Sequence, residues 1–235
     1  MIYKILKIPV LFFLIIVSNN LFSKINVKWK LNLKTQQATV YVHNEGNKKI
    51  AFPLDTKSFQ AYFSDNYVVS QSEWNKDYPF YSFTINVYDV INNKLIETNS
   101  TTPYLDLSDF EKQKANIKLN NKNYNSKIRL WKKMHNLKND LDAEINYYLM
   151  QNLILLEPKE EKSFSIVFNL RNITNKNNIV QDSYVLEKNR DYLVFLSLFV
   201  KNDVYNYFTP SQKEKLKKYK FFTGSLESNK IELKE

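Results

Sequence analysis

The chain has 235 residues, with 34 Lys and Arg against 24 Asp and Glu for a formal net charge of +10, no cysteine and two glycines. The lack of cysteine excludes disulfides, thiol chemistry, sulfur-ligated metals and a lipid-modified N-terminal cysteine. The scarcity of glycine excludes the Gly-x-Ser-x-Gly elbow of serine hydrolases, phosphate-cradling loops and dinucleotide fingerprints.

The N-terminus has the layout of a secretory signal peptide. Two lysines and no acid accompany an apolar run at 8–17, and a short polar segment leads to Ser23. The run is about ten residues long, whereas a membrane-spanning helix needs roughly 20. We predict that residues 1–23 are a cleaved signal and that residues 24–235 form one secreted or periplasmic domain. An N-terminal membrane anchor is the alternative, because Leu21 is larger than the residue usual before a cleavage site.

The first part of the mature chain alternates apolar and polar residues, which indicates strands with one face on a core. The predicted strands cover residues 25–33, 38–42, 50–54, 59–63, 80–91 and 94–97. Asn92 and Asn93 form the turn before the last of these strands. Asparagine tolerates left-handed backbone angles, so it can replace the missing glycines in such turns.

A helical insertion is predicted at about 106–152. Ser108 and Glu111 fit a capping box that opens a short helix, and the asparagine-rich stretch 120–125 should end it. From Ser126, apolar residues recur at spacings of three and four, which predicts one amphipathic helix to about residue 152. The expected buried stripe consists of Leu130, Met134, Leu137, Leu141, Ile145 and Tyr148.

Strand patterns then return at 164–170 and at 192–200, where nearly continuous hydrocarbon predicts a central strand buried on both faces. Ser211 and Glu214 fit a capping box for a short C-terminal helix, and strands at 221–224 and 230–233 close the chain. About ten short strands separated by polar turns favour a mainly β fold. We predict an immunoglobulin-like antiparallel β-sandwich with a helical insertion and a short C-terminal helix.

Several strands resemble those of secreted bacterial immunoglobulin-like proteins, in particular proteinase-inhibitor-like domains. The similar segments are the hairpin 38–44 and 50–54, the strand 83–89 and the turn Leu156-Glu157-Pro158-Lys159-Glu160, where Lys159 replaces the glycine usual in that family. The resemblance implies the sandwich fold and no particular activity.

The densest charge lies between residues 112 and 138, where nine cations and no acid occur. Such a segment favours an anionic partner, which could be an acidic protein, an envelope surface or a polysaccharide; nucleic acid is not expected outside the cell. A solvated helix face and a codon bias toward lysine are the alternatives. The candidate patch for an anionic ligand comprises Lys127, Arg129, Lys132 and Lys133.

A second candidate site is the aromatic loop that contains Trp74, Tyr78 and Tyr81. These rings could stack on sugars, or they could cover the end of the sandwich.

Metal and cofactor sites are not predicted. His43 and His135 are far apart in sequence, and without cysteine they make a poor ligand set. Asp140, Asp142 and Glu144 resemble the start of a calcium loop, but the required glycine is missing and the segment reads as helix.

These features favour an exported, non-enzymatic binding protein of unknown ligand. The alternatives are a hydrolase of polysaccharide or peptide, with two carboxylates brought together from separate strands, and an envelope docking subunit that exposes an apolar strip on residues 126–152.

Overall fold

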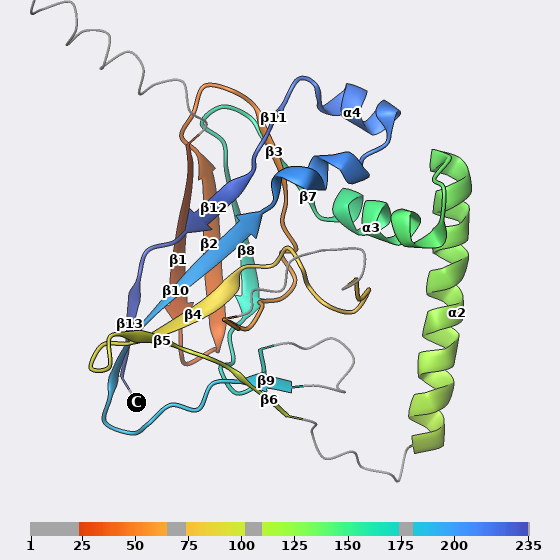
Figure 1. Cartoon of the computed structure of the whole chain (residues 1–235). Helices are drawn as coiled ribbons and strands as arrows, with labels where there is room; N and C mark the ends of the chain where they lie inside the picture. Colours follow the sequence, from red (N-terminus) through yellow and green to blue (C-terminus); the bar gives the residue numbers. More distant parts are fainter. Residues whose placement is uncertain (1–23, 65–73, 102–109, 174–180, 235) are drawn as a thin grey trace, which may run out of the picture.

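The computed structural model describes residues 24–64, 74–101, 110–173 and 181–234 (Figure 1). The predicted signal peptide, Ser108 and most of the aromatic loop before Trp74 lie outside these residues. The described part is mainly β, with several antiparallel sheets and accompanying helices.

The first sheet contains β1 (Ile25–Asn32), β2 (Gln37–Asn44) and β8 (Glu161–Val167), in the order β1-β2-β8 and antiparallel throughout. Its buried side chains fall at every second position, including Val27 and Trp29 on β1 and Val40 and Val42 on β2. The predicted alternation is therefore confirmed in this sheet.

The second sheet is built around β10 (Asp191–Val200). One edge of β10 pairs with β4 (Thr84–Asp89), which pairs with β5 (Lys94–Ile96); the other edge pairs with β12 (Gly224–Glu227) and then β13 (Ile231–Lys234). The strand predicted at 80–91 is thus limited to 84–89. The prediction that β10 is buried on both faces is wrong at the end of the strand, where Phe199 is 57% exposed.

The third sheet consists of β11 (Lys220–Phe221), β3 (Ile50–Pro53) and β7 (Leu153–Leu156), with β11 parallel to β3. A separate pair joins β6 (Asn99–Thr101) to β9 (Gln181–Ser183). The strand predicted at 59–63 is reduced to a bridge between Gln60 and Thr84.

Strands from before and after the helical segment share each of these sheets: β8 pairs with β2, β10 with β4, and β7 with β3. Their buried side chains belong to one hydrophobic core, which also includes Ile145, Leu149 and Val204 from the helices. The strands on the two sides of the helical segment therefore pair with each other.

The helical segment differs from its prediction. Helix α2 (Phe110–His135) runs without interruption through residues 120–125, and a turn separates it from α3 (Asp140–Gln151). Asparagine costs only some tenths of a kcal/mol in a helix, roughly 0.7 at most, so the asparagine-rich stretch does not end α2. The single helix predicted at 126–152 is also wrong, because a turn divides this region between the end of α2 and α3.

Two short helices follow β10. They are η2 (Asn202–Tyr207) and α4 (Pro210–Leu216). The C-terminal helix is confirmed, but its cap is Thr209 with Gln212 in the reciprocal position, two residues before the predicted box. Among the described residues, we find no helix with the length and hydrophobicity that a membrane span requires.

Candidate functional site

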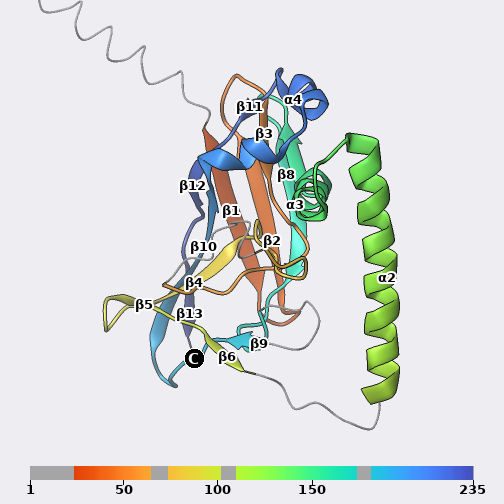
Figure 2. The ribbon, with the colours of Figure 1, turned by 45° about the vertical axis from the view of Figure 1, so that its right-hand side comes forward.

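Helix α2 stands at the side of the β-rich body and reaches it through α3 (Figures 1 and 2). Among the side chains of α2 whose burial is described, only Ile128 is fully buried, at 2% exposure. Tyr124, Trp131 and His135 are half-buried on the same side of the helix, because residues three and four apart lie on one face. The half of α2 before Tyr124 is mostly exposed.

Asn146 is the buried residue that links α2 to the rest of the molecule. Its side-chain oxygen accepts a 2.8 Å hydrogen bond from Nε1 of Trp131 on α2. Its amide nitrogen donates to the carbonyl oxygen of Tyr207 and to Gln212, each at 2.7 Å, and Gln212 donates back at 3.0 Å. A fully satisfied buried amide of this kind rigidifies its surroundings, so it fixes the position of α2.

Further contacts on this inner side of α2 hold the helix in the same place. The ring centroid of Trp131 lies 4.0 Å from that of His135 and 5.2 Å from that of Tyr147 on α3. Lys132 forms a 2.8 Å ion pair with Asp140, and its hydrogen bond lowers the pKa of that carboxyl group. These contacts use the inner face and leave the outer face of α2 exposed.

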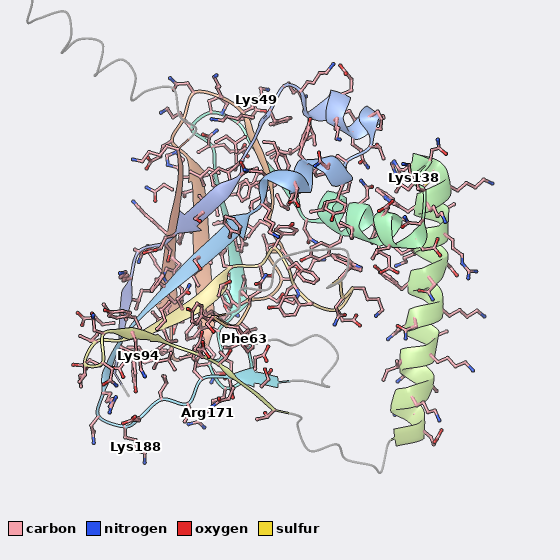
Figure 3. All side chains as sticks on the ribbon, viewed as in Figure 1. Lys49, Phe63, Lys94, Lys138, Arg171 and Lys188 are labelled. Atoms are coloured by element: carbon pink, nitrogen blue, oxygen red, sulfur yellow. The ribbon has the colours of Figure 1, made fainter. Side chains whose placement is uncertain are left out.

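Four exposed cations on α2 form what we call the basic row: Lys118, Lys122, Arg129 and Lys133. They occur at positions i, i+4, i+11 and i+15, so they follow one side of the helix over about 22 Å. Within the described structure none of these four side chains has an ion pair or hydrogen-bond partner. Figure 3 shows the long side chains of α2 projecting away from the body.

Three exposed apolar residues form a second line beside the first, the apolar row: Leu119, Leu130 and Met134, which are 56%, 59% and 60% exposed. Each follows a member of the basic row in sequence, so the two rows lie on adjacent faces. The apolar row is opposite Ile128, and Lys127 borders it on its other side. Helix α2 is therefore apolar toward α3 and also toward solvent.

The predicted patch is brought together only in part. Arg129 and Lys133 share the basic row, whereas Lys132 faces α3 and Asp140, and Lys127 lies on a different side of the helix. The four residues therefore do not form one surface. Lys118 and Lys122 complete the row instead. Their spacing in the sequence would have identified them if the helix had been predicted to continue through residues 120–125.

The aromatic loop contributes to the protein interior. The ring of Trp74 stacks on Phe80 at 5.2 Å, and its Nε1 donates a 2.9 Å hydrogen bond to Glu144 on α3. Tyr81 is 3% exposed, and this burial raises the pKa of its hydroxyl group above the usual value. The faces of Trp74 and Tyr81 are thus largely occupied by protein.

Tyr78 and Tyr81 also line a pocket of about 420 Å³ above the outer face of the second sheet. Asn86, Ser197 and Phe199 are also among the residues that line it. Among the described residues, those that line it include no carboxylate. A second pocket of about 540 Å³, between the α2–α3 turn and η2, contains Asp142 and Asp203.

The other ionisable residues singled out from the sequence lie within regular strands and helices. His43 is half-buried on β2, and His135 is half-buried against Trp131. Asp140, Asp142 and Glu144 lie within α3, so the segment is a helix and not a calcium loop. Within the described residues, no three histidine or acidic groups are placed to hold a metal ion.

Comparisons with known proteins give no match: no family model, no curated protein and no solved structure is similar to the chain. The exposed face of α2 is therefore the feature from which a function can be inferred.

Proposed function

We propose that this is an exported, non-enzymatic binding protein that attaches to an anionic surface through the basic row of α2. The observation that carries the proposal is the set of four unpaired cations aligned along the exposed face of a helix that is firmly attached to the body. The body acts as the scaffold, and α2 is the binding element.

The charge distribution supports an anionic ligand. The only acid of α2 is Glu111 in its first turn, two turns before Lys118, so no acid lies among the four cations of the basic row. A cation near an anionic surface contributes about 1 kcal/mol, so four aligned cations together contribute about 4 kcal/mol at low salt. Salt weakens this attraction, because the Debye length is about 8 Å at physiological ionic strength.

We further propose that the scaffold is a β-sandwich of the immunoglobulin type. The first and second sheets contribute alternate side chains to the same core, which supports a packing of sheet on sheet. Trp29 of β1 and Phe168 contact each other with ring centroids 5.7 Å apart inside that core. Export directed by residues 1–23, with cleavage before Lys24, would place this scaffold outside the cytosol.

Charge reversal along the basic row tests the proposal. We expect the variant Lys118→Glu, Lys122→Glu, Arg129→Glu, Lys133→Glu to lose binding both to vesicles that contain phosphatidylglycerol and to dextran sulfate, a hydrated polyanion. The loss should be at least about 100-fold, because four attractive charges become repulsive. Co-sedimentation measures vesicle binding, and fluorescence anisotropy of the labelled protein measures binding to the polymer.

A matched control reverses four exposed lysines elsewhere: Lys28, Lys94, Lys188 and Lys215, each to Glu. Lys94 and Lys188 lie on the side of the molecule away from α2 (Figure 3). The control has the same net charge as the test variant, so it should retain most of the binding if position matters. Equal losses in the two variants would show that binding depends on net charge alone, and the proposal would fail.

A further inference from the structure

We infer that the anionic surface is a phospholipid bilayer and that α2 lies flat on it with the apolar row immersed in the headgroup region. This inference rests on the proposed function and names its ligand. The observation behind it is that exposed hydrocarbon lies beside the basic row near both of its ends, at Leu119 and at Leu130 and Met134.

The arrangement of residues on α2 suits an interface between water and lipid. Leu119, Leu130 and Met134 lie opposite the face that packs on α3, so they can approach a flat surface without displacing the body. In both views the ribbon shows no other element on that side of α2 (Figures 1 and 2). A helix with cations beside an apolar face binds parallel to an anionic membrane.

The cations flank the apolar row on both sides. The basic row borders it on one side and Lys127 on the other. Long lysine and arginine side chains extend their charged ends toward phosphate groups while their hydrocarbon stems cover apolar surface. The same helix can therefore bury the apolar row and keep every charge at the level of the headgroups.

Charge and hydrocarbon together favour lipid over the other anionic ligands. A hydrated polysaccharide supplies negative charges but no apolar medium for Leu119, Leu130 and Met134. An anionic bilayer supplies both negative charge and an apolar medium, in one flat surface that extends along the full length of the helix. Between Leu119 and Leu130 the apolar row is interrupted by the polar residue Asn123, which limits insertion to a shallow depth.

The test replaces the apolar row and leaves every charge in place. We expect the variant Leu119→Ser, Leu130→Ser, Met134→Ser to bind vesicles of phosphatidylcholine and phosphatidylglycerol at least about tenfold more weakly than the parent. The reason is that it lacks the three apolar side chains that the bilayer would bury. Its affinity for dextran sulfate should change by less than about twofold, because the charges are unchanged.

A control variant carries Leu33→Ser, Ile91→Ser and Val185→Ser, three exposed apolar residues outside α2. It should bind vesicles like the parent. Circular dichroism and the thermal midpoint of each variant report whether the fold is intact. As a second measurement, brominated lipid should quench a larger part of the fluorescence of vesicle-bound Leu130→Trp protein than of the bound parent, which has three native tryptophans.

The outcomes separate this inference from the proposed function. If the apolar variant binds vesicles as well as the parent, or if quenching in the bound Leu130→Trp variant is no larger than in the bound parent, the inference fails while the basic row is still the binding site. If charge reversal in the basic row also leaves vesicle binding unchanged, both fail. If the apolar variant loses binding to vesicles and retains binding to dextran sulfate, the result supports a bilayer as the ligand.

Discussion

Left-handed backbone positions in this protein are occupied mainly by asparagine. Asn93, Asn136 and Asn189 have φ values of 53°, 51° and 60°. The sequence predicts this use of asparagine, because two glycines cannot supply every turn. Lys159 is different: it has φ 65° at the third position of a turn that begins at Glu157, a left-handed conformation that glycine adopts more readily.

Asp89 organises the hairpin between β4 and β5. One carboxylate oxygen accepts hydrogen bonds from the backbone N–H groups of Ile91 and Asn92, at 2.9 and 3.0 Å. The other accepts from the side chains of Asn92 and Arg190, at 2.7 and 2.9 Å. The backbone hydrogen bond from Asn92 is the largest cause of a pKa below the usual value, and the remaining donors add to it.

This geometry predicts a pH-dependent contribution to stability. A depressed pKa in the fold means that the stabilisation by Asp89 is complete above the unfolded-state value, about 3.9, and is lost as the pH falls through the folded-state value. The free energy of unfolding of the Asp89→Asn variant should therefore lie below that of the parent at neutral pH, and the difference should shrink in acid. Urea denaturation at several pH values measures it.

The exposed Glu232 provides the control for that experiment. The variant Glu232→Gln should match the parent across the same pH range. A constant difference between parent and Asp89→Asn from neutral to acid would contradict the role given to the carboxylate.

At the scale of elements, the turn between α2 and α3 is the feature that apolar periodicity did not predict. Asn136 adopts a left-handed conformation, and the N–H of Leu137 bonds back to the carbonyl of Lys132, which ends α2. Asn139 then caps α3 through a 2.7 Å hydrogen bond from the N–H of Asp142. Both signals are in the sequence, but the apolar spacing continues across them.

The direction of burial changes at this turn. Ile145 and Tyr148 are buried as the stripe predicts, because they belong to α3 and face the core. Leu130 and Met134 precede the turn and face solvent. The predicted stripe is therefore divided between two helices, with its first residues exposed on α2 and its last residues buried on α3. For this reason the sequence did not predict the exposed apolar row. The alternative of a docking element with exposed apolar residues on 126–152 anticipated part of it.

The attachment of α2 depends on Asn146, which leads to a stability prediction. The variant Asn146→Ala leaves Trp131 Nε1, the Tyr207 carbonyl and Gln212 without their partner. Unsatisfied buried groups cost about 1–3 kcal/mol each when no water replaces the partner, so we expect a loss of about 3 kcal/mol in the free energy of unfolding. Chemical denaturation followed by circular dichroism measures this loss.

Asn121 on α2 offers a matched control, since it is half-buried and has no hydrogen-bond partner within the described structure. Asn121→Ala should be neutral or slightly stabilising, because alanine favours helix. If Asn146→Ala is as stable as Asn121→Ala, then Asn146 does not hold α2 in place.

At the scale of the whole molecule, the sheet pairings were the most predictable feature. Alternating patterns on both sides of the helical segment required partners, and β8 and β10 find them in β2 and β4. Strand β7, which pairs with β3, was not predicted. The short strands β6, β9 and β11 were less predictable, because two or three residues do not establish a period. Their pairing depends on tertiary contacts.

The sequence predicted the positive charge of the candidate site but not which of its cations lie on one face of the helix. The sequence alone locates the cations between Lys112 and Lys138. Which of them align depends on where α2 begins, turns and ends, and on which face α3 and Trp131 cover. The ion pair of Lys132 with Asp140 removes one predicted member, and the continuous helix adds Lys118 and Lys122.

A single fluorescent label tests most directly whether the outer face of α2 is the binding surface, since the chain has no native cysteine to compete for it. A label at Ser126→Cys lies between the basic and apolar rows, and one at Lys188→Cys lies on the opposite side of the body. When anionic vesicles bind, acrylamide quenching should fall sharply at Ser126→Cys and stay unchanged at Lys188→Cys. Undiminished quenching at Ser126→Cys in vesicle-bound protein would contradict the account.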